Sequence, residues 1–223
     1  MYEYNLQMRK LKGLLKASHF GPTLIVTAIS FAFGTYYWWE GPAYVIAFGV
    51  FTGQLVVGWS NDLYDFDDDL KHQRSKKPLV SGLITKQYLQ KWLRFMLPFS
   101  FVANLLGPLG IKGGLVYMLG IACGVAYNFY FKFNLLSPLP YAIAFAALPS
   151  SVAISKDINP PMWMLLGGAL FGMAAHFINV IKDMDQDQAS GIKGFPQRLG
   201  QTKSIAAASV LIALGIVNLI IYL

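Results

Sequence analysis

Long apolar stretches, separated by short polar segments, make up most of the sequence. Each stretch approaches the ~20 residues that an α-helix needs to cross a bilayer. Strands of a membrane β-barrel would instead show segments of about 10 residues with alternating hydrophobicity, and that pattern does not occur. The pattern therefore predicts an all-α fold, a polytopic membrane helix bundle of about seven transmembrane helices. The predicted spans are 22–39, 43–59, 92–109, 113–131, 137–154, 161–181 and 205–223.

The composition supports a membrane protein. Of the 223 residues, 55% are hydrophobic and only 13% are charged, whereas a soluble domain carries about 25% charged residues. The one cysteine, Cys123, lies within a predicted span and has no partner for a disulfide. A disulfide framework and a thiolate metal site are therefore excluded.

The basic residues are distributed unevenly across the predicted membrane. The net charge of +7 would suit a nucleic-acid binder, but all Lys and Arg residues except Lys112 and Lys156 fall on one side of the seven spans. The positive-inside rule places that side in the cytoplasm. We therefore expect a multi-pass integral membrane protein, with the N-terminus in the cytoplasm and with no nucleic-acid partner.

Most of the acidic residues occur in two short segments. Of the 11 acidic residues, five lie in NDLYDFDDD (61–69) and three in DMDQD (183–187). Each segment follows an even-numbered predicted span, so both are expected as loops on the cytoplasmic side. The other three, Glu3, Glu40 and Asp157, are expected in solvated loops or tails.

The two acidic segments share a spacing. The first reads Asn61-x3-Asp65-x3-Asp69 and the second Asn179-x3-Asp183-x3-Asp187, so the offset from 61 to 179 is 118 positions. Basic residues follow each segment, and a similar tag, GLITK or LGQTK, precedes the next span. This spacing predicts a duplicated unit within a single domain, 1–223, whose copies contribute one motif each to a common site.

Residues at i, i+4 and i+8 lie on one face of a helix, where like charges repel. The arrangement is more favourable if cations neutralise the acids, and carboxylate and amide oxygens suit Mg²⁺, which bridges carboxylates to substrate phosphates. The basic residues that follow would hold a phosphate bound through the metal. Together these groups predict a diphosphate site.

The acidic segments have two other possible interpretations. An EF-hand loop beginning at Asp65 or Asp183 needs Gly at its sixth position and Glu at its twelfth. The residues there are Leu70 and Lys76 in the first segment and Gln188 and Gly194 in the second, so both fail. A pair of solvated loops without a ligand remains open, although the shared spacing disfavours it.

At these residues the sequence resembles the UbiA superfamily of intramembrane prenyltransferases. Its first motif, NDxxDxxxD, matches 61–69, and its second, DxxxD, matches 183–187. The stretch KPLVSG (77–82) resembles the basic segment that follows the first motif, with Lys where Arg is common. ASHFGPTL, YNFYFK and SPLPYAIAFAALP extend the resemblance over about residues 16–203. The family usually has nine spans, so a chain with seven is expected to be a shortened member, without the last two helices, or part of a longer one.

The resemblance implies an enzyme that uses Mg²⁺, with more than one ion expected. It would move a polyprenyl group from its diphosphate to a small, aromatic acceptor in lipid or quinone biosynthesis. The implied catalytic residues are Asn61, Asp62, Asp65, Asp69, Asp183 and Asp187, and all of these except Asp62 are expected to hold metal. Diphosphate contacts are expected from Arg74, Lys77, Lys132, Lys193 and Arg198. Residues expected to line the chamber are Lys16, His19, Tyr127, Asn128, His176 and Asn179.

Several alternatives stay open at this stage. A terpene cyclase of the UbiA type would use the same diphosphate site, and only its product would differ. A non-catalytic lipid-binding scaffold or a divalent-cation transporter is a further possibility. A transporter should place ionisable residues near the bilayer midplane, whereas these spans carry essentially no acidic residues and the acids gather at one interface. Each basic residue alone also suits a membrane anchor, and His176 also suits a hydrogen bond between helices. The partners expected are a prenyl diphosphate, a small acceptor and membrane lipids.

Overall fold

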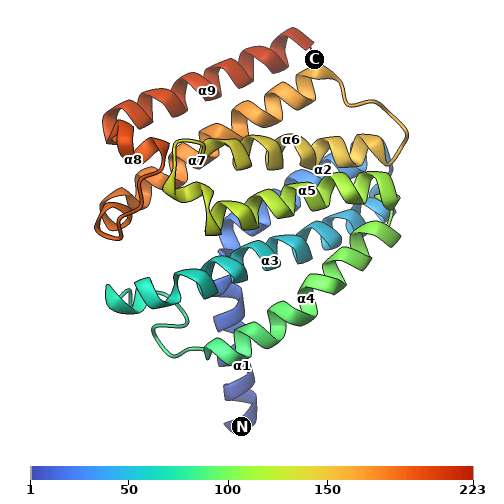
Figure 1. The fold of residues 1–223 in the computed structure, drawn as a ribbon. Helices are drawn as coiled ribbons and strands as arrows, with labels where there is room; N and C mark the ends of the chain where they lie inside the picture. The colour runs from blue at the N-terminus through green and yellow to red at the C-terminus, as the bar shows by residue number, and fades with distance from the viewer. Residues whose placement is uncertain (1, 223) are drawn as a thin grey trace. The chain divides into compact units, whose positions relative to one another are not determined.

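The computed structural model describes residues 2–222 and the side chains of residues 4–222 (Figure 1). Within these residues the chain is helical and contains no strand. It divides into two compact units, the N-terminal unit Met1–Pro108 and the C-terminal unit Leu109–Leu223. The prediction of a single domain over 1–223 stays a prediction. The helices are α1 (Tyr2–Ala17), α2 (Phe20–Tyr37), α3 (Glu40–Lys71), α4 (Lys86–Leu106), α5 (Gly110–Phe129), the 3₁₀ turn η1 (Phe131–Phe133), α6 (Pro138–Ile154), α7 (Met162–Ala189), α8 (Phe195–Leu199) and α9 (Gln201–Tyr222).

In the N-terminal unit, α3 packs against both α2 and α4, while α1 runs across the direction of α3 (Figure 1). Small residues allow the helices to approach closely. A Cβ atom on Gly34 would lie 2.9 Å from the Cα of Ala43, so only glycine permits this contact between α2 and α3. Such small-residue contacts are typical of helices packed in membranes.

In the C-terminal unit, α7 packs between α6 and α9, and α5 packs against α6. The short helix α8 contacts both α7 and α9. Glycines again mark the closest approach, because a Cβ on Gly168 would lie 2.7 Å from the Cα of Ala146 on α6. The second acidic segment lies at the other end of α7, in its last turns.

Both acidic segments lie in the last turns of helices, not in loops as the sequence suggested. α3 has 32 residues and is about 48 Å long, which exceeds the ~30 Å of a bilayer core. It therefore continues through the first segment to Lys71, and α7 continues through the second to Ala189. Basic side chains neutralise the buried acids of α3, as described below, and this offsets the repulsion that would weaken the helix.

Four helices among the described residues are long and apolar enough to span a membrane, namely α3, α5, α7 and α9. Helices α1 and α2 meet this test only together, as a pair bent by 70°. The predicted span 137–154 forms α6, an apolar helix of 17 residues, and 92–109 falls on α4, which begins with basic residues. A total of seven spans stays a prediction.

The 118-residue offset recurs in the positions of the helices. Adding 118 to the bounds of α2 gives 138–155, close to those of α6. The same shift takes α3 to 158–189 and α4 to 204–224, close to the bounds of α7 and α9. We propose that this correspondence reflects the internal duplication that the acidic segments suggested.

The turns after α3 and α7 correspond as well. Gln73 and Gly191, which are 118 positions apart, both have positive φ angles, of 52° and 72°. The backbone N–H of Arg74 donates to the carbonyl of Asp69, and that of Ile192 donates to the carbonyl of Asp187. Positive φ at this position is a common way to end a helix, and here it turns the following segment back toward the acidic side chains.

Trp59 links α3 to α1 in the core of the N-terminal unit. Its side chain is buried, and its Nε1 donates a hydrogen bond of 2.9 Å to the carbonyl of Leu14. We expect Trp59→Phe to lower the free energy of unfolding by about 1–2 kcal/mol, from the lost hydrogen bond and the lost volume. Thermal unfolding in detergent measures this. Trp39→Phe, at a site 63% exposed, is the control, and equal shifts in Tm would contradict the prediction.

Candidate functional site

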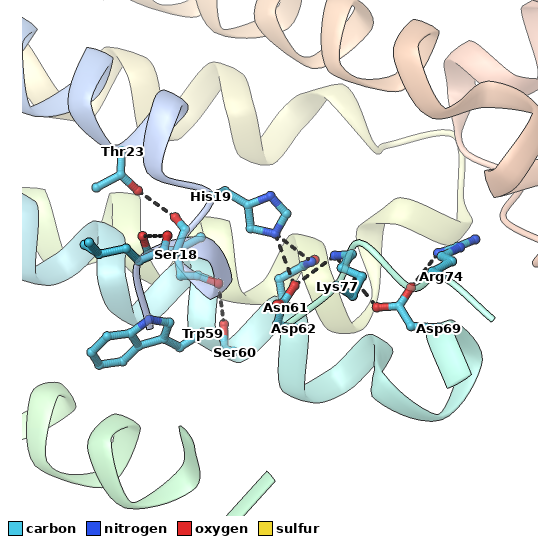
Figure 2. A network of polar contacts seen from close by, with 12 residues as sticks. Ser18, His19, Thr23, Trp59, Ser60, Asn61, Asp62, Asp69, Arg74 and Lys77 are labelled. Atoms are coloured by element: carbon cyan, nitrogen blue, oxygen red, sulfur yellow. Dashed lines mark hydrogen bonds and ion pairs between the residues drawn. The ribbon is translucent and has the colours of Figure 1, made fainter. Parts of the chain in front are cut away.

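Two acidic side chains of the first segment are buried on one face of α3. Asp62 and Asp69 are each 2% exposed, and their separation of seven positions places them two turns apart on one side of the helix. Lys77 lies between them, with its Nζ 2.8 Å from Asp62 Oδ1 and 3.7 Å from Asp69 Oδ2 (Figure 2). The ammonium group therefore bridges the two carboxylates.

Arg74 closes the other end of this network. Its Nη1 donates to Asp69 Oδ1 over 2.7 Å (Figure 2), and its Nη2 lies 3.6 Å from Asp68 Oδ2. The turn at Gln73 makes this contact possible, because it reverses the chain directly after α3. Arg74 and Lys77, two of the five basic residues predicted to bind diphosphate, thus lie beside the first acidic segment.

The balance of burial and charge keeps Lys77 protonated. Burial lowers the pKa of its ammonium group, but the carboxylates of Asp62, Asp69 and Asp65 raise it more, and the net shift is upward. Lys77 therefore carries a positive charge at neutral pH. Asp65 belongs to the same face as Asp62 and Asp69, three positions after the first and four before the second.

His19 contacts the first segment from the junction between α1 and α2. Its Nε2 lies 3.4 Å from Asp62 Oδ1 and 3.4 Å from Asn61 Nδ2 (Figure 2). Its backbone is left-handed, with φ of 52°, and its side chain is 46% exposed. Lys16 is exposed on α1. Of the residues expected to line the chamber, His19 is therefore in contact with the first acidic segment.

The first segment has the chemistry to hold a hard cation. Asp62 Oδ2 is buried and has no hydrogen-bond partner, which is costly for a carboxylate oxygen unless a cation or another donor meets it. No three His, Cys, Asp or Glu side chains in the part of the chain that the structure describes form a complete metal cage. Mg²⁺ rarely uses such a cage, because it binds through one or two carboxylates together with water and substrate phosphates. The residues present therefore fit Mg²⁺.

The second acidic segment has a different environment on α7. Asp187 is partly buried, and its Oδ2 accepts a hydrogen bond of 2.8 Å from Nε2 of Gln197. The Oε1 atom of Gln197 is buried and has no partner. Asp183 and Asp185 are exposed and border a small hollow of about 110 Å³, together with Gln201 and neighbouring residues of α7.

A polar cluster surrounds His176 within the C-terminal unit. The imidazole is 1% exposed, and its Nε2 lies 3.1 Å from the Oγ of Ser137. Ser137 Oγ also accepts a hydrogen bond from the backbone N–H of Phe195. The rings of Tyr127 and Tyr141 lie 5.3 and 4.9 Å from that of His176, and Tyr141 is hydrogen-bonded to Asn179. Three residues expected to line the chamber, Tyr127, His176 and Asn179, therefore gather in one place.

The comparisons with known proteins come from sequence and from structure. Residues 21–223 match the UbiA prenyltransferase family. The chain belongs to the UbiA prenyltransferase family. No curated protein matches its sequence at a significant level.

Solved structures of UbiA proteins share the fold at low sequence identity. A UbiA homologue from Archaeoglobus fulgidus bound to DMAPP and Mg²⁺ has a TM-score of 0.74 and 18% identity, over 95% of this chain and 75% of that one. A structure of a UbiA homologue from the same organism bound to GPP and Mg²⁺ has a TM-score of 0.73 and 17% identity, over 96% of this chain and 76% of that one. A structure of digeranylgeranylglyceryl phosphate synthase has a TM-score of 0.67 and 18% identity, over 94% of this chain and 76% of that one.

The remaining basic and polar residues predicted for this UbiA family member fall in the C-terminal unit. Lys132 and Asn128 are buried, at 5% and 4% exposure. Lys193 and Arg198 are exposed, and Arg198 Nε donates to the carbonyl of Lys193 over 2.8 Å. Their roles in binding, like the meeting of the two acidic segments at one site, stay predictions.

Three side chains of this UbiA family member that contact predicted site residues were missed from the sequence. Gln197 binds Asp187, Ser137 binds His176, and Tyr141 packs on His176. Gln197 lies ten positions after Asp187 in a short helix, and nothing in its surroundings marks it. Ser137 and Tyr141 belong to the stretch SPLPYAIAFAALP, which contributed to the family resemblance, and that was the one available signal.

Proposed function

We propose that this protein is a Mg²⁺-dependent intramembrane prenyltransferase that moves a polyprenyl group from its diphosphate to a small, aromatic acceptor. Membership of the UbiA family supports the reaction class. The observation that carries the proposal is the buried, unpartnered Oδ2 of Asp62, a carboxylate whose other oxygen, Oδ1, accepts from the ammonium group of Lys77. A carboxylate, an incomplete cation site and basic groups in one place suit a metal-bound diphosphate.

Each acidic segment has residues suited to hold Mg²⁺. In the first these are Asn61, Asp65 and Asp69, to which the geometry adds Asp62, and in the second they are Asp183 and Asp187. Bound Mg²⁺ would neutralise negative charge on the diphosphate leaving group.

The basic residues would act on the diphosphate directly. Arg74 and Lys77 lie on the acidic face of α3, so their N–H groups are placed to donate charge-assisted hydrogen bonds to phosphate oxygens. Fixed donors of this kind stabilise charge that develops as the carbon–oxygen bond breaks.

The aromatic cluster around His176 is proposed to line the chamber in which the prenyl group reacts. Faces of Tyr127 and Tyr141 could stabilise an allylic cation, and the apolar surroundings would exclude water that would otherwise capture it. The positive-inside rule supports a cytoplasmic location for both acidic segments.

The structural neighbours support the donor and the metal. The Archaeoglobus fulgidus homologue was solved with DMAPP and Mg²⁺ and with GPP and Mg²⁺, so the fold accommodates prenyl diphosphates of different length together with the ion. We therefore propose a prenyl diphosphate as the donor here.

An assay of diphosphate release tests the proposal. Purified protein would be incubated with Mg²⁺ and prenyl diphosphates of ten to twenty carbons, with and without quinol-type aromatic acceptors. We expect release that EDTA abolishes, and a prenylated acceptor as the product. A cyclic hydrocarbon formed without acceptor would indicate a terpene cyclase instead. No release with any donor, from protein shown to be folded, would favour a lipid-binding scaffold.

Asp183→Asn tests the second acidic segment, with Asp185→Asn as its matched control, because both side chains are exposed on α7 and lose the same charge. We expect Asp183→Asn to slow diphosphate release by about a hundredfold or more, since it removes a group that would hold the metal. Asp185→Asn should retain most of the rate. Similar rates for the two variants would remove Asp183 from the site.

A further inference from the structure

One face of α1 is attached to the rest of the N-terminal unit. Leu14 and Ala17 are buried in its core. Arg9 Nη2 donates to the carbonyl of Gly82 over 2.8 Å, and Lys10 Nζ lies 5.2 Å from the ring centre of Tyr88. These contacts fix how α1 is turned about its own axis, and therefore which face points away from the protein.

The opposite face of α1 is apolar and exposed. Tyr4, Met8, Leu11 and Leu15 follow a spacing of four, three and four positions and so form one stripe along the helix. Tyr4 is 65% exposed, Met8 48% and Leu11 50%, and Leu15 is partly exposed. A stripe of large apolar side chains of this kind marks an interaction surface.

Positive charge accompanies the stripe. Lys12, which is exposed, lies on its edge, one position after Leu11. Lys16 is also exposed, whereas Arg9 and Lys10, the other two basic residues of the helix, contact Gly82 and Tyr88. The one acidic residue of the helix is Glu3. A helix with an apolar stripe and basic flanks suits the interface of a bilayer that contains anionic lipids.

The bend between α1 and α2 sets the direction of α1 relative to a membrane. α2 has 18 residues and is about 27 Å long, close to the ~30 Å of a bilayer core. α1 turns away from it by 70°, at the left-handed residue His19. The sequence predicts that the segment 22–39, most of which forms α2, crosses the bilayer, and α1 would then lie close to the membrane plane. Figure 1 shows α1 running across α3.

We propose that α1 lies on the bilayer surface as an in-plane anchor. Tyr4, Met8, Leu11 and Leu15 enter the interfacial region, and the exposed side chains of Lys12 and Lys16 bind anionic lipid headgroups. A bilayer suits this face better than a protein partner, because α2, which contains most of the predicted span 22–39, begins three residues after the end of α1 and would keep the stripe beside the membrane. The long Lys side chains reach from the edge of the stripe to the headgroups.

Fluorescence quenching in nanodiscs tests the position of the stripe. Cys123 would be replaced with alanine, and a single cysteine introduced at Leu11, or at Asn5 as the control on the polar flank, would carry an environment-sensitive dye. The nanodiscs would contain phosphatidylcholine and phosphatidylglycerol, with nitroxide-labelled lipids that quench near the headgroups or at the bilayer centre. We expect headgroup-level quenching of the Leu11→Cys dye to be several-fold stronger than that of the Asn5→Cys dye.

Three outcomes would overturn the anchor. Weak quenching at both positions would place α1 in water. Quenching of the Leu11→Cys dye mainly at the bilayer centre would make α1 part of a span. A dye shielded from both lipid and aqueous quenchers, with cross-linking between copies, would make the stripe a protein interface.

Lys12→Gln tests the contribution of charge, with Lys76→Gln, at an exposed position after α3, as the matched control. We expect Lys12→Gln to lower the ratio of inserted to free α1 by about fivefold when phosphatidylglycerol is present, and to have little effect in phosphatidylcholine alone. Equal effects in the two lipids, or equal effects of the two variants, would contradict headgroup binding by Lys12.

Discussion

Asp62→Asn is expected to slow diphosphate release by about a hundredfold to a thousandfold. Asp62 is 2% exposed and has one oxygen on Lys77 and one with no partner. The amide has nearly the same shape but lacks the negative charge that would hold a cation and orient Lys77. Steady-state release of diphosphate from the best prenyl donor measures the effect.

Asp67→Asn is the matched control for Asp62→Asn. Asp67 lies on the same helix, loses the same charge and is 86% exposed, so its variant should retain most of the rate. A second readout is the rise in melting temperature that Mg²⁺ with inorganic diphosphate produces, which should shrink in Asp62→Asn because a ligand stabilises the state that it binds. If both variants keep the full rate and the full shift, Asp62 is not part of the site.

A loss of folding in Asp62→Asn would have to be distinguished from a loss of chemistry. Asp62→Asn leaves Lys77 with a weaker partner in a buried position, which costs stability. Adding Lys77→Met removes the ammonium group that has lost the closer of its two carboxylate partners, so the double variant should recover part of its melting temperature. Its rate should remain low, because neither group that would bind the diphosphate or its metal is restored.

Gly58→Ala is expected to lower the free energy of unfolding by about 1–3 kcal/mol and to reduce activity as well. A Cβ at position 58 would lie 2.6 Å from the carbonyl oxygen of Ser18 and 2.7 Å from its Cα. Ser18 cannot move away easily, because its N–H donates to Leu14 and its carbonyl accepts from Thr23 Oγ1 (Figure 2). The added methyl group must push the α1–α2 junction off α3.

Movement of the junction would carry His19 away from Asp62, which is why activity should fall together with stability. Gly21→Ala is the control, since nothing lies within 4 Å of a Cβ at that position in α2. Alanine has the higher helix propensity, so that variant should be as stable as the parent or slightly more so. Thermal unfolding in detergent measures the stability of both variants. If Gly58→Ala were as stable as the parent, the α1–α2 junction could move to accommodate the added methyl group, and the prediction would be wrong.

The sequence was sufficient to predict the fold class and the family, because hydropathy and the two acidic motifs are local signals. It was less informative about which acids are buried. Spacing by four favours the set Asn61, Asp65 and Asp69, whereas the structure buries Asp62 and Asp69. Both sets are compatible with one helical face. Which of these acids are buried depends on how α3 is turned about its own axis by its contacts with α2 and the α1–α2 junction. No local sequence pattern indicates that rotation.

The helical state of the acidic segments could not be predicted for a related reason. Five acids in nine residues oppose a helix if they are considered alone. The groups that neutralise them follow later in the chain, and they reach the acids only because the chain reverses at Gln73. Lys77, which binds Asp62 across 15 positions, depends on that reversal. Such ion-pair partners can be identified only when the position of the turn at Gln73 is known.

The ion pairs of Lys77 and Arg74 mean that the first acidic segment carries its own counter-charge. The folded state of this region therefore does not depend on a supply of divalent cations. With the proposed dependence on Mg²⁺, the protein in a cell depleted of magnesium would stay intact in the membrane, inactive and protected from the quality-control machinery that removes unfolded chains. It would resume work when the ion returned, without new synthesis.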